Sequence, residues 1–362
     1  MTIYILYFIF FAILAVEYEI YKFNPKPLLI TSIILLGLLA GLRGSETSRD
    51  YYTYQESFDF IYDNLTRNDG VFLPIFEPGF MGIVVLFRSI FIYNYGVAIM
   101  LFFAFASVIL KILSFKKFTA NPFLAILFFY SQYFLLHEMT QIRIGLASAI
   151  FFIALFYYFS NNYKMYVLLI LLAALFHYSA ILYLFLLLFK KDLLNRNLYC
   201  GLLILAITFS LFTIPLINLL SYFDPASVSG RLTNYAMISE KGLAKQINVF
   251  NVVTIINYIL CFYLLFGVPK IELMADRFTV FFLKCNIISI LILPLFSSIP
   301  SMAFRCSELF GISSMFLFAS LVKYLPFKKI NLVIVVSVAL LIFCVNIFYA
   351  NLVLDYHIIN FK

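Results

Sequence analysis

Apolar runs that are long enough to cross a membrane recur along this chain. The stretches 165–189 and 330–350 contain no lysine, arginine, aspartate or glutamate, and about 20 apolar residues in a helix span ~30 Å of hydrocarbon. Hydrophobic residues make up 64% of the 362 residues and charged residues 12%. A soluble domain is roughly half apolar and about a quarter charged. We therefore expect an all-α, polytopic integral membrane protein.

The apolar runs divide the chain into a series of expected spans. We predict about 11–12 transmembrane helices, two of them half-helices, in a single membrane domain over residues 1–362. The expected spans are 2–18, 28–42, 94–115, 122–136, 142–160, 165–175, 179–189, 198–220, 247–268, 278–296, 307–325 and 330–350. The first run lacks a basic leading segment and a small-residue cleavage site, so we interpret it as a retained span.

Basic residues between the spans indicate the orientation. If the lysine-rich loops lie in the cytoplasm, both termini lie outside. The run 165–189 has basic residues at both ends, which predicts two half-helices that turn at His177. If the segment 76–92 crossed the membrane, the lysines of the loop that follows would lie outside the cell instead of in the cytoplasm. Because the segment has Pro78 near its start and Arg88 within it, we predict that it is a helix lying in the outer interface.

This topology collects ionisable residues on one side of the membrane. It creates two long extracytoplasmic loops, 43–93 and 221–246, and the first carries seven carboxylates and four arginines. The residues that fall in outer loops or at outer ends of spans are Arg43, Asp50, Glu77, His137, Glu138, Arg143, His177, Arg231 and Arg305. Ionisable residues at membrane depth are costly and are candidates for function.

Arginines on the outer side are candidate ligands for phosphate. A guanidinium stays charged and matches phosphate oxygens with a planar fork, which suits a lipid-linked phosphate or pyrophosphate. The candidates are Arg43, Arg143, Arg231 and Arg305. Each has a structural alternative: Arg143 could pair with Glu138, Arg305 could pair with Glu308 one helical turn away, and Arg231 could be an ordinary solvated side chain.

Three residues are candidates for catalytic acid–base roles. Histidine changes charge near neutral pH, and His177 lies at the expected helix break. Asp50 and Glu77 could deprotonate a sugar hydroxyl or stabilise a positively charged sugar transition state. A hydrogen-bonded structural histidine and solvated loop carboxylates are the alternatives. His357, in the C-terminal tail, is not expected to contribute.

Further residues are candidates for sugar binding. Tyrosine rings in the first outer loop could stack on sugars, or could form an interfacial aromatic belt. The candidates for sugar contact are Tyr51, Tyr54, His137, Glu138 and Glu308.

Several classes of function are disfavoured by the sequence. The net charge of +8 comes largely from lysines in short loops between spans, so we expect no nucleic-acid partner. The five cysteines form no CxxC pair or Cys/His cluster, and the chain has no Asp-x-Asp motif, so we predict no metal and no cofactor. Without a P-loop or a GxGxxG motif, nucleotide-driven transport is not expected.

Five short motifs follow one another along the chain in an order that resembles a known family. They are GLRGSETSRDYYTY, FEPGF, QIRIGLASAI, ALFHYSAILY and FRCSELF. Together they resemble the EpsG family of Wzy-type polysaccharide polymerases, closely over residues 35–185 and loosely in the C-terminal half.

The resemblance implies a multi-pass enzyme of the bacterial cytoplasmic (inner) membrane with its active site on the extracytoplasmic side. It would join oligosaccharide repeat units carried on undecaprenyl pyrophosphate, by metal-independent glycosyl transfer. It implies a GT-C-like arrangement of helices. The expected partners are these lipid-linked glycans and membrane lipids, with a flippase and a chain-length regulator as further candidates.

Three other functions remain open at this point. One is a different lipid-linked glycosyltransferase or ligase, which would use the same arginines. Another is a membrane O-acyltransferase, in which His137 and Glu138 could form the catalytic pair. The third is a glycolipid flippase, but a transporter should carry charges near the bilayer midplane, and here they gather at one face.

Overall fold

The computed structural model of the chain describes residues 1–48, 50–66, 76–189, 191, 193–212, 247–297, 299–327 and 330–359. Helices dominate these residues, and the only β-pairing described in them is one isolated bridge between Arg43 and Ile358. The predicted all-α class is therefore confirmed. The chain forms two compact units, Met1–Phe189 together with Ala319–Lys362, and Lys190–Phe318.

Helices occur at each expected span for which residues are described. Five are long and apolar enough to cross a membrane, and one bent pair can count as a sixth span. The five are α1 (Thr2–Tyr21), α5 (Tyr95–Phe118), α7 (Ile142–Phe159), α14 (Arg277–Leu295) and α17 (Asn331–Cys344) continued by η4 (Val345–Tyr349). The bent pair is α15 (Pro300–Gly311) with α16 (Ser314–Tyr324), at 41°. The chain is thus a multi-pass membrane protein.

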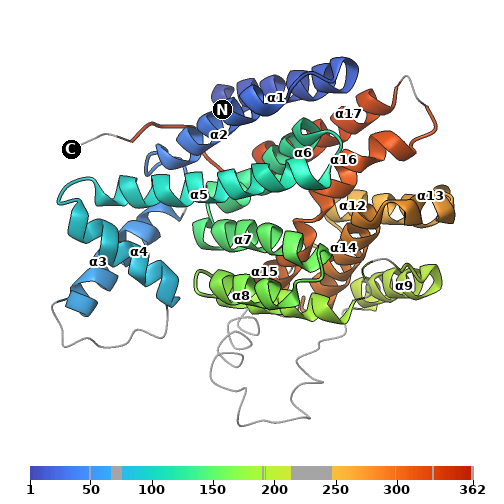
Figure 1. Cartoon of the computed structure of the whole chain (residues 1–362). Helices are drawn as coiled ribbons and strands as arrows, with labels where there is room; N and C mark the ends of the chain where they lie inside the picture. The colour runs from blue at the N-terminus through green and yellow to red at the C-terminus, as the bar shows by residue number, and fades with distance from the viewer. Residues whose placement is uncertain are drawn as a thin grey trace, which may run out of the picture. The chain divides into compact units, whose positions relative to one another are not determined.

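The remaining described helices are shorter. They are α2 (Lys26–Gly41), α3 (Tyr51–Thr66), α4 (Pro78–Ile90), α6 (Pro122–Phe128), η1 (Phe129–Glu138), α8 (Tyr163–Ala174), η2 (Tyr178–Leu188), α9 (Arg196–Phe212), α12 (Val252–Phe262), η3 (Tyr263–Gly267) and α13 (Lys270–Ala275). Within the first unit, α5, α7 and α8 lie side by side (Figure 1).

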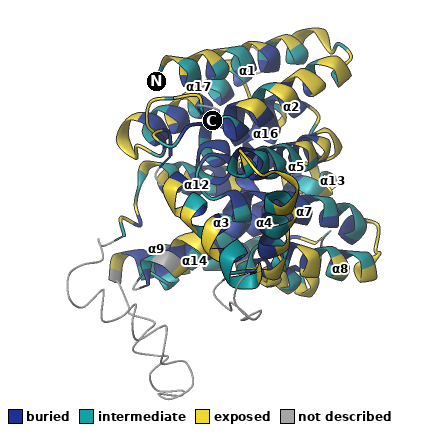
Figure 2. Ribbon diagram, turned by 90° about the vertical axis from the view of Figure 1, so that its left-hand side faces the viewer, coloured by how far each residue is buried: buried dark blue, intermediate teal, exposed yellow. Residues whose placement is uncertain are grey.

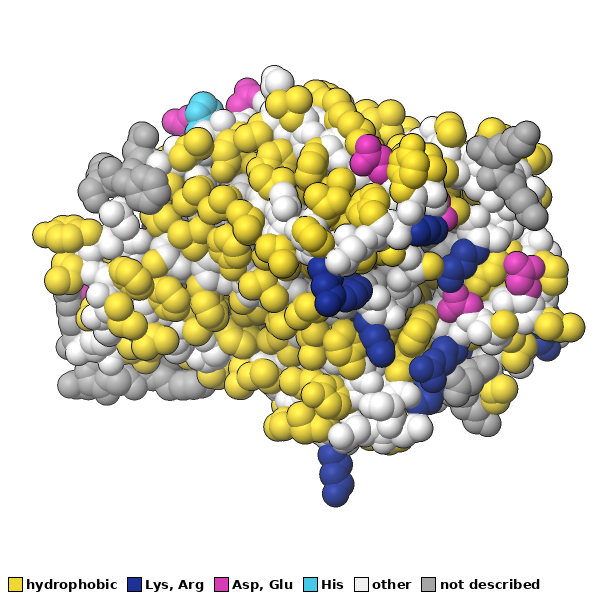
Figure 3. Space-filling model, turned by 45° about the horizontal axis from the view of Figure 1, so that its top comes forward, with side chains coloured by type: hydrophobic (Ala, Val, Ile, Leu, Met, Phe, Trp, Pro, Cys, Tyr) yellow, Lys and Arg dark blue, Asp and Glu magenta, His cyan; other side chains and the backbone are white. Residues whose placement is uncertain are grey.

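Hydrophobic side chains remain exposed along the helices, as expected of surfaces that face lipid. On α1, Leu6 and Ile13 are more than half exposed. Figure 2 shows exposed residues along α1 and along one face of α3. On the face drawn in Figure 3, hydrophobic side chains form a broad expanse, and lysines and arginines gather toward one side of it.

The expected pair of half-helices is confirmed. Helix α8 ends at Ala174, His177 is extended (φ −155°, ψ 112°), and the 3₁₀ helix η2 then runs back along α8. The Tyr166 hydroxyl donates a hydrogen bond to the Tyr183 carbonyl at 2.5 Å. The Tyr158 hydroxyl lies 2.9 Å from the Phe189 carbonyl oxygen. The hairpin therefore begins and ends near the same end of α7.

The described part of segment 43–93, the predicted first outer loop, contains two helices, of which only the second was predicted. Helix α4 lies within the predicted interfacial segment 76–92. Helix α3 was not foreseen, because its polar composition suggested a loop. Its buried residues Tyr51, Tyr54, Phe58 and Ile61 recur every three or four positions, which is the pattern of an amphipathic helix. The predicted loop 221–246 lies outside the described residues.

The C-terminal tail folds back onto the segment that follows α2. The Gly44 amide donates to the His357 carbonyl at 2.6 Å, and the Ile359 amide donates to the Leu42 carbonyl at 3.0 Å. The N-terminal ammonium lies 2.5 Å from Asp355. Both termini therefore share one end of the unit with Arg43, as the predicted topology requires. Which side of the membrane this is stays a prediction.

Two glycines let α2 approach α5 closely. A Cβ atom at Gly37 would lie 2.5 Å from the Phe105 ring, and one at Gly41 would lie 2.5 Å from Leu101 Cδ2 and 3.0 Å from Leu101 Cα. Small residues four positions apart commonly allow such contact between membrane helices.

Replacing Gly41 by valine should destabilise the fold, because the new side chain would overlap Leu101, including its backbone. We expect the free energy of unfolding in detergent to fall by about 1–3 kcal/mol, the usual cost of overpacking. Gly201→Val is the matched control, because nothing lies within 4 Å of a Cβ at Gly201. Equal thermal stability of the two variants would contradict this account of the α2–α5 contact.

Candidate functional site

The Glu77 carboxylate forms the centre of a buried polar cluster in the first unit. Its side chain is almost fully buried, at the residue that immediately precedes α4. Arg143 Nη1 donates to Glu77 Oε2 at 2.5 Å, and His177 Nδ1 lies 3.3 Å from Glu77 Oε1. One carboxylate thus joins the start of α4, the first turn of α7 and the turn between the half-helices.

The backbone around Glu77 explains why these segments meet. The Gly79 amide donates to the Leu175 carbonyl at 2.8 Å, and a Cβ atom at Gly79 would lie 2.8 Å from that oxygen. Only glycine lets the first turn of α4 reach the end of α8 this closely. The Tyr178 hydroxyl donates to the Phe76 carbonyl at 3.1 Å. The FEPGF and ALFHYS motifs, which are about 100 residues apart by numbering, are therefore in direct contact.

Aromatic residues hold the Arg143 guanidinium in place. It lies 5.2 Å from the centre of the Phe80 ring, within the range of a cation–π interaction. It also interacts with the hydroxyl of Tyr54, whose side chain is buried. The Arg143 side chain remains 27% exposed, so it can still be reached by a ligand.

Arg43 is a fully buried cation beside this cluster. Its Nη1 donates to the Ala40 carbonyl, its Nη2 lies 3.5 Å from Met100 Sδ, and its Nε has no hydrogen-bond partner among the described residues. Within the described part of the chain, no carboxylate hydrogen-bonds to Arg43. Glu138 acts on Arg43 only electrostatically. Because a buried charge without a direct ionic partner is costly, a bound anion would be favoured beside Arg43.

Tyrosines link Arg43 to the rest of the cluster. Tyr54 interacts electrostatically with both Arg43 and Arg143, and Tyr51 with Arg43. Asp50, which immediately precedes α3 and is half-buried, also acts on Tyr54. The structure thus brings together Arg43, Asp50, Tyr51, Tyr54, Glu77, Arg143 and His177, all candidates from the sequence.

A second buried ion pair lies next to the first. Lys111 Nζ donates to Glu138 Oε1, which also accepts a hydrogen bond from Ser107 at 3.0 Å. His137 is fully buried and interacts electrostatically with Lys111 and His177. The alternative in which Arg143 pairs with Glu138 is therefore wrong, because Arg143 pairs with Glu77 and Glu138 with Lys111. A sugar contact at His137 and Glu138 stays a prediction.

Sequence reasoning missed Lys111. It stands alone in the apolar run VILKILSF, inside an expected span. A charged residue at that depth is a functional or structural candidate by the same rule that selected the outer residues. Applying that rule inside the span as well as at its ends would have found it.

Two predicted residues belong to the second unit, and one lies outside the described residues. Arg305 is exposed on α15 and interacts electrostatically with Glu308 on the same helix, as their spacing suggested. Their roles in pyrophosphate and sugar binding stay predictions. Arg231 is among the residues that the structure does not describe. Within the described part of the chain, no group of three or more His, Cys, Asp or Glu side chains is placed to hold a metal ion.

The sequence of the chain matches the profile of a known protein family. The sequence profile of the EpsG family matches residues 26–362. The chain belongs to the EpsG family. No curated protein and no solved structure matches it. Membership of the EpsG family indicates a role in polysaccharide biosynthesis, and in general terms that of a polysaccharide polymerase.

The charge state of Glu77 in this EpsG-family protein follows from its partners. Burial by itself would raise the pKa of the Glu77 carboxyl. The close approach of His177 and the charge of Arg143 outweigh burial, so the pKa of Glu77 lies below its ordinary value of 4.5. Glu77 is therefore a carboxylate at neutral pH, which makes it a weak proton acceptor and a strong orienting group.

The pH dependence of stability should reveal the Glu77 interactions. Because the pKa of Glu77 is lowered on folding, its carboxylate stabilises the fold above pH 4.5 and loses this effect as the pH falls through the folded value. We expect Glu77→Gln to have a lower melting temperature than the wild type at pH 7 and a smaller loss of stability between about pH 5 and about pH 3. Glu56→Gln, at an exposed site on α3, should behave as the wild type. Parallel pH curves for Glu77→Gln and the wild type would contradict this.

The Lys111–Glu138 pair should show strong coupling in a double-mutant cycle. Lys111→Met leaves the Glu138 charge buried without its partner and should lower the free energy of unfolding by about 3–5 kcal/mol. The double variant Lys111→Met/Glu138→Gln should recover most of this loss, because it removes both charges. Unfolding in detergent measures the three free energies. A double variant no more stable than Lys111→Met would show that the ion pair is not the reason for the loss.

Proposed function

We propose that this protein joins undecaprenyl-pyrophosphate-linked oligosaccharide repeat units into a surface polysaccharide. The reaction takes place on the outer face of the bacterial cytoplasmic membrane, and glycosyl transfer is metal-independent. The observation that carries the proposal is the arrangement of Arg143, Glu77 and His177 next to the buried Arg43, in a chain of the EpsG family.

The arginines would act on the leaving group. The growing chain on its lipid pyrophosphate is the donor, and the bond between its anomeric carbon and the pyrophosphate oxygen breaks. Arg143 is partly exposed and would contact the pyrophosphate. Arg43 is fully buried and would add positive potential from within the protein. Arg305 and Arg231 are proposed as further ligands.

His177 would take the proton of the acceptor. Its Nδ1 lies 3.3 Å from the Glu77 carboxylate, and its Nε2 is buried and has no hydrogen-bond partner among the described residues, so the acceptor must enter to reach it. A carboxylate that orients one ring nitrogen leaves the other to act as the base. The acceptor hydroxyl of a second lipid-linked repeat loses its proton to Nε2 and forms the new bond to the anomeric carbon. Asp50 is the other candidate base.

The sugar-binding residues complete the proposed site. Tyr51 and Tyr54 lie on the face of α3 that meets the charged cluster. His137, Glu138 and Glu308 keep their proposed roles in sugar contact. Membrane lipids surround the site, and a flippase and a chain-length regulator are the proposed protein partners.

The polymer made by cells tests the proposal. In a deletion strain, lipid-linked glycan should collapse to a single repeat unit, and restoring the wild-type protein should restore the ladder of chain lengths on a gel. Arg143→Ala should reduce polymer formation roughly 100-fold or more, the scale on which loss of a group that stabilises a developing charge reduces rates. Arg277→Ala, at an exposed site at the start of α14, is the matched control and should restore the ladder.

Membrane levels of each variant must be equal for this comparison. An intact ladder in the deletion strain would overturn the polymerase and would favour acyl transfer or transport. A normal ladder with Arg143→Ala would leave the polymerase standing and remove Arg143 from its site.

A further inference from the structure

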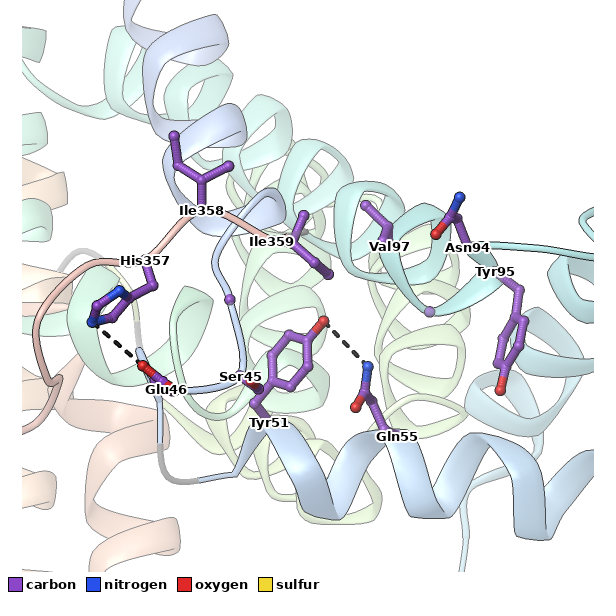
Figure 4. Close-up of a pocket in the computed structure, with 12 residues that line it drawn as sticks. Ser45, Glu46, Tyr51, Gln55, Asn94, Tyr95, Val97, His357, Ile358 and Ile359 are labelled. Carbon is purple, nitrogen blue, oxygen red and sulfur yellow. Dashed lines mark hydrogen bonds and ion pairs between the residues drawn. The ribbon is translucent and has the colours of Figure 1, made fainter. Parts of the chain in front are cut away.

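A cavity of about 580 Å³ lies in the first unit, beside the charged cluster. Its walls come from the segment after α2, the first turns of α3 and α5, and the C-terminal tail (Figure 4). Its polar lining residues are Ser45, Glu46, Tyr51, Gln55, Asn94, Tyr95 and His357. Three parts of the sequence that are far apart thus form one enclosure.

Residues 357–359 of the C-terminal tail form one wall of this cavity and are held there by hydrogen bonds. The Thr47 hydroxyl accepts a hydrogen bond from the His357 amide at 3.0 Å and lies 3.3 Å from the His357 carbonyl oxygen. A Cβ atom at Gly44 would lie 3.1 Å from that carbonyl oxygen, so the close approach depends on glycine. His357 was not expected to contribute, but Nε2 of its ring lies 3.6 Å from Glu46 at the rim of the cavity (Figure 4).

The chemistry of the lining selects the class of ligand. Gln55 and Asn94 carry carboxamides, each with both donors and acceptors, and Tyr51 carries a hydroxyl. The Tyr95 hydroxyl donates to Asp59 and can still accept a hydrogen bond. Gln55 Nε2 donates to the Tyr51 hydroxyl at 3.3 Å. None of the described lining residues is a lysine or an arginine, so the cavity is not built for phosphate. Carboxamides and hydroxyls, together with the carboxylate of Glu46, suit the hydroxyls of a glycan.

The position of the cavity relates it to the proposed reaction. Tyr51 lines the cavity, and Tyr54, one turn further along α3, interacts with Arg143 and Arg43. One turn of helix advances about 5 Å. A glycan in the cavity would therefore extend directly from a pyrophosphate held at Arg143.

We propose that this cavity is a glycan subsite of the polymerase, closed on one side by residues 357–359 of the tail. The inference rests on the proposed function and assigns the sugar part of the same substrate. The glycan belongs either to the growing chain or to the incoming repeat.

Gly96 offers a way to block the cavity without touching the charged cluster. It lies in the cavity wall, in the first turn of α5, and a Cβ there would meet only Gln55 and Phe58, at 3.9 Å. Gly96→Leu should fill part of the cavity. Gln55→Leu removes the carboxamide and leaves a shorter apolar side chain. Gly201→Leu is the control, at a site on α9 where nothing lies within 4 Å.

The probe is the oligosaccharide released by mild acid from the lipid-linked pool of the cells, as single repeats and as longer oligomers. Calorimetry on the full-length protein in detergent should show binding that weakens about tenfold or more in Gly96→Leu and Gln55→Leu and is unchanged in Gly201→Leu. Tighter binding of longer oligomers would assign the cavity to the growing chain. Equal binding of one and several repeats would assign it to the incoming repeat.

Two results separate this inference from the proposed function. If Gly96→Leu and Gln55→Leu bind the oligosaccharides as the wild type does, and restore the full ladder in cells, the subsite is overturned and the polymerase stands. If no ladder depends on the wild-type protein, the proposed function itself fails. Chains shortened by Gly96→Leu at wild-type protein levels, with binding weakened, support the subsite.

Discussion

The bridge from Glu77 to Arg143 and His177 is the interaction on which the candidate site of the first unit depends. Glu77 is buried, and a buried carboxylate is tolerated only when charges and hydrogen bonds compensate for lost water. Its two partners come from a helix tip and from a broken helix. Without Glu77, the polar groups of each segment would have fewer partners. The carboxylate joins the two segments. The contact of Gly79 with Leu175 shows that the backbone is shaped for this meeting.

Arg43 gives the cluster its electrostatic character. Arg143 is neutralised by Glu77 and Lys111 by Glu138, whereas no carboxylate in the described part of the chain hydrogen-bonds to Arg43. Tyr51, Tyr54 and Glu138 act on Arg43 only electrostatically, so its charge lacks a direct carboxylate partner at the C-terminal end of α2. A low-dielectric site strengthens the field of such a charge, as the proposed departure of a pyrophosphate would require. The adjacent cavity has hydrogen-bonding groups in place of lysine and arginine, which matches its proposed role in binding the glycan.

Much of the architecture was predictable, because the bilayer imposes simple rules on a sequence. The apolar runs predicted the helices, and the basic residues at both ends of 165–189 predicted the hairpin at His177. Helix α3 was missed because a surface helix with few apolar residues resembles a loop in composition. Its periodicity, with Tyr51, Tyr54 and Phe58 on one face, was present in the sequence and was not used.

The sequence by itself determined the class of the protein, most of the residues that the structure gathers around Glu77, and the order of its motifs. These follow from hydropathy and residue chemistry, which act locally along the chain. Only the tertiary structure decided which charges pair, that Lys111 rather than Arg143 takes Glu138, and that the C-terminal tail closes a cavity beside Tyr51. Partner choice depends on which helix faces meet in space, and several carboxylates were equally available to each arginine until packing brought one of them within hydrogen-bonding distance.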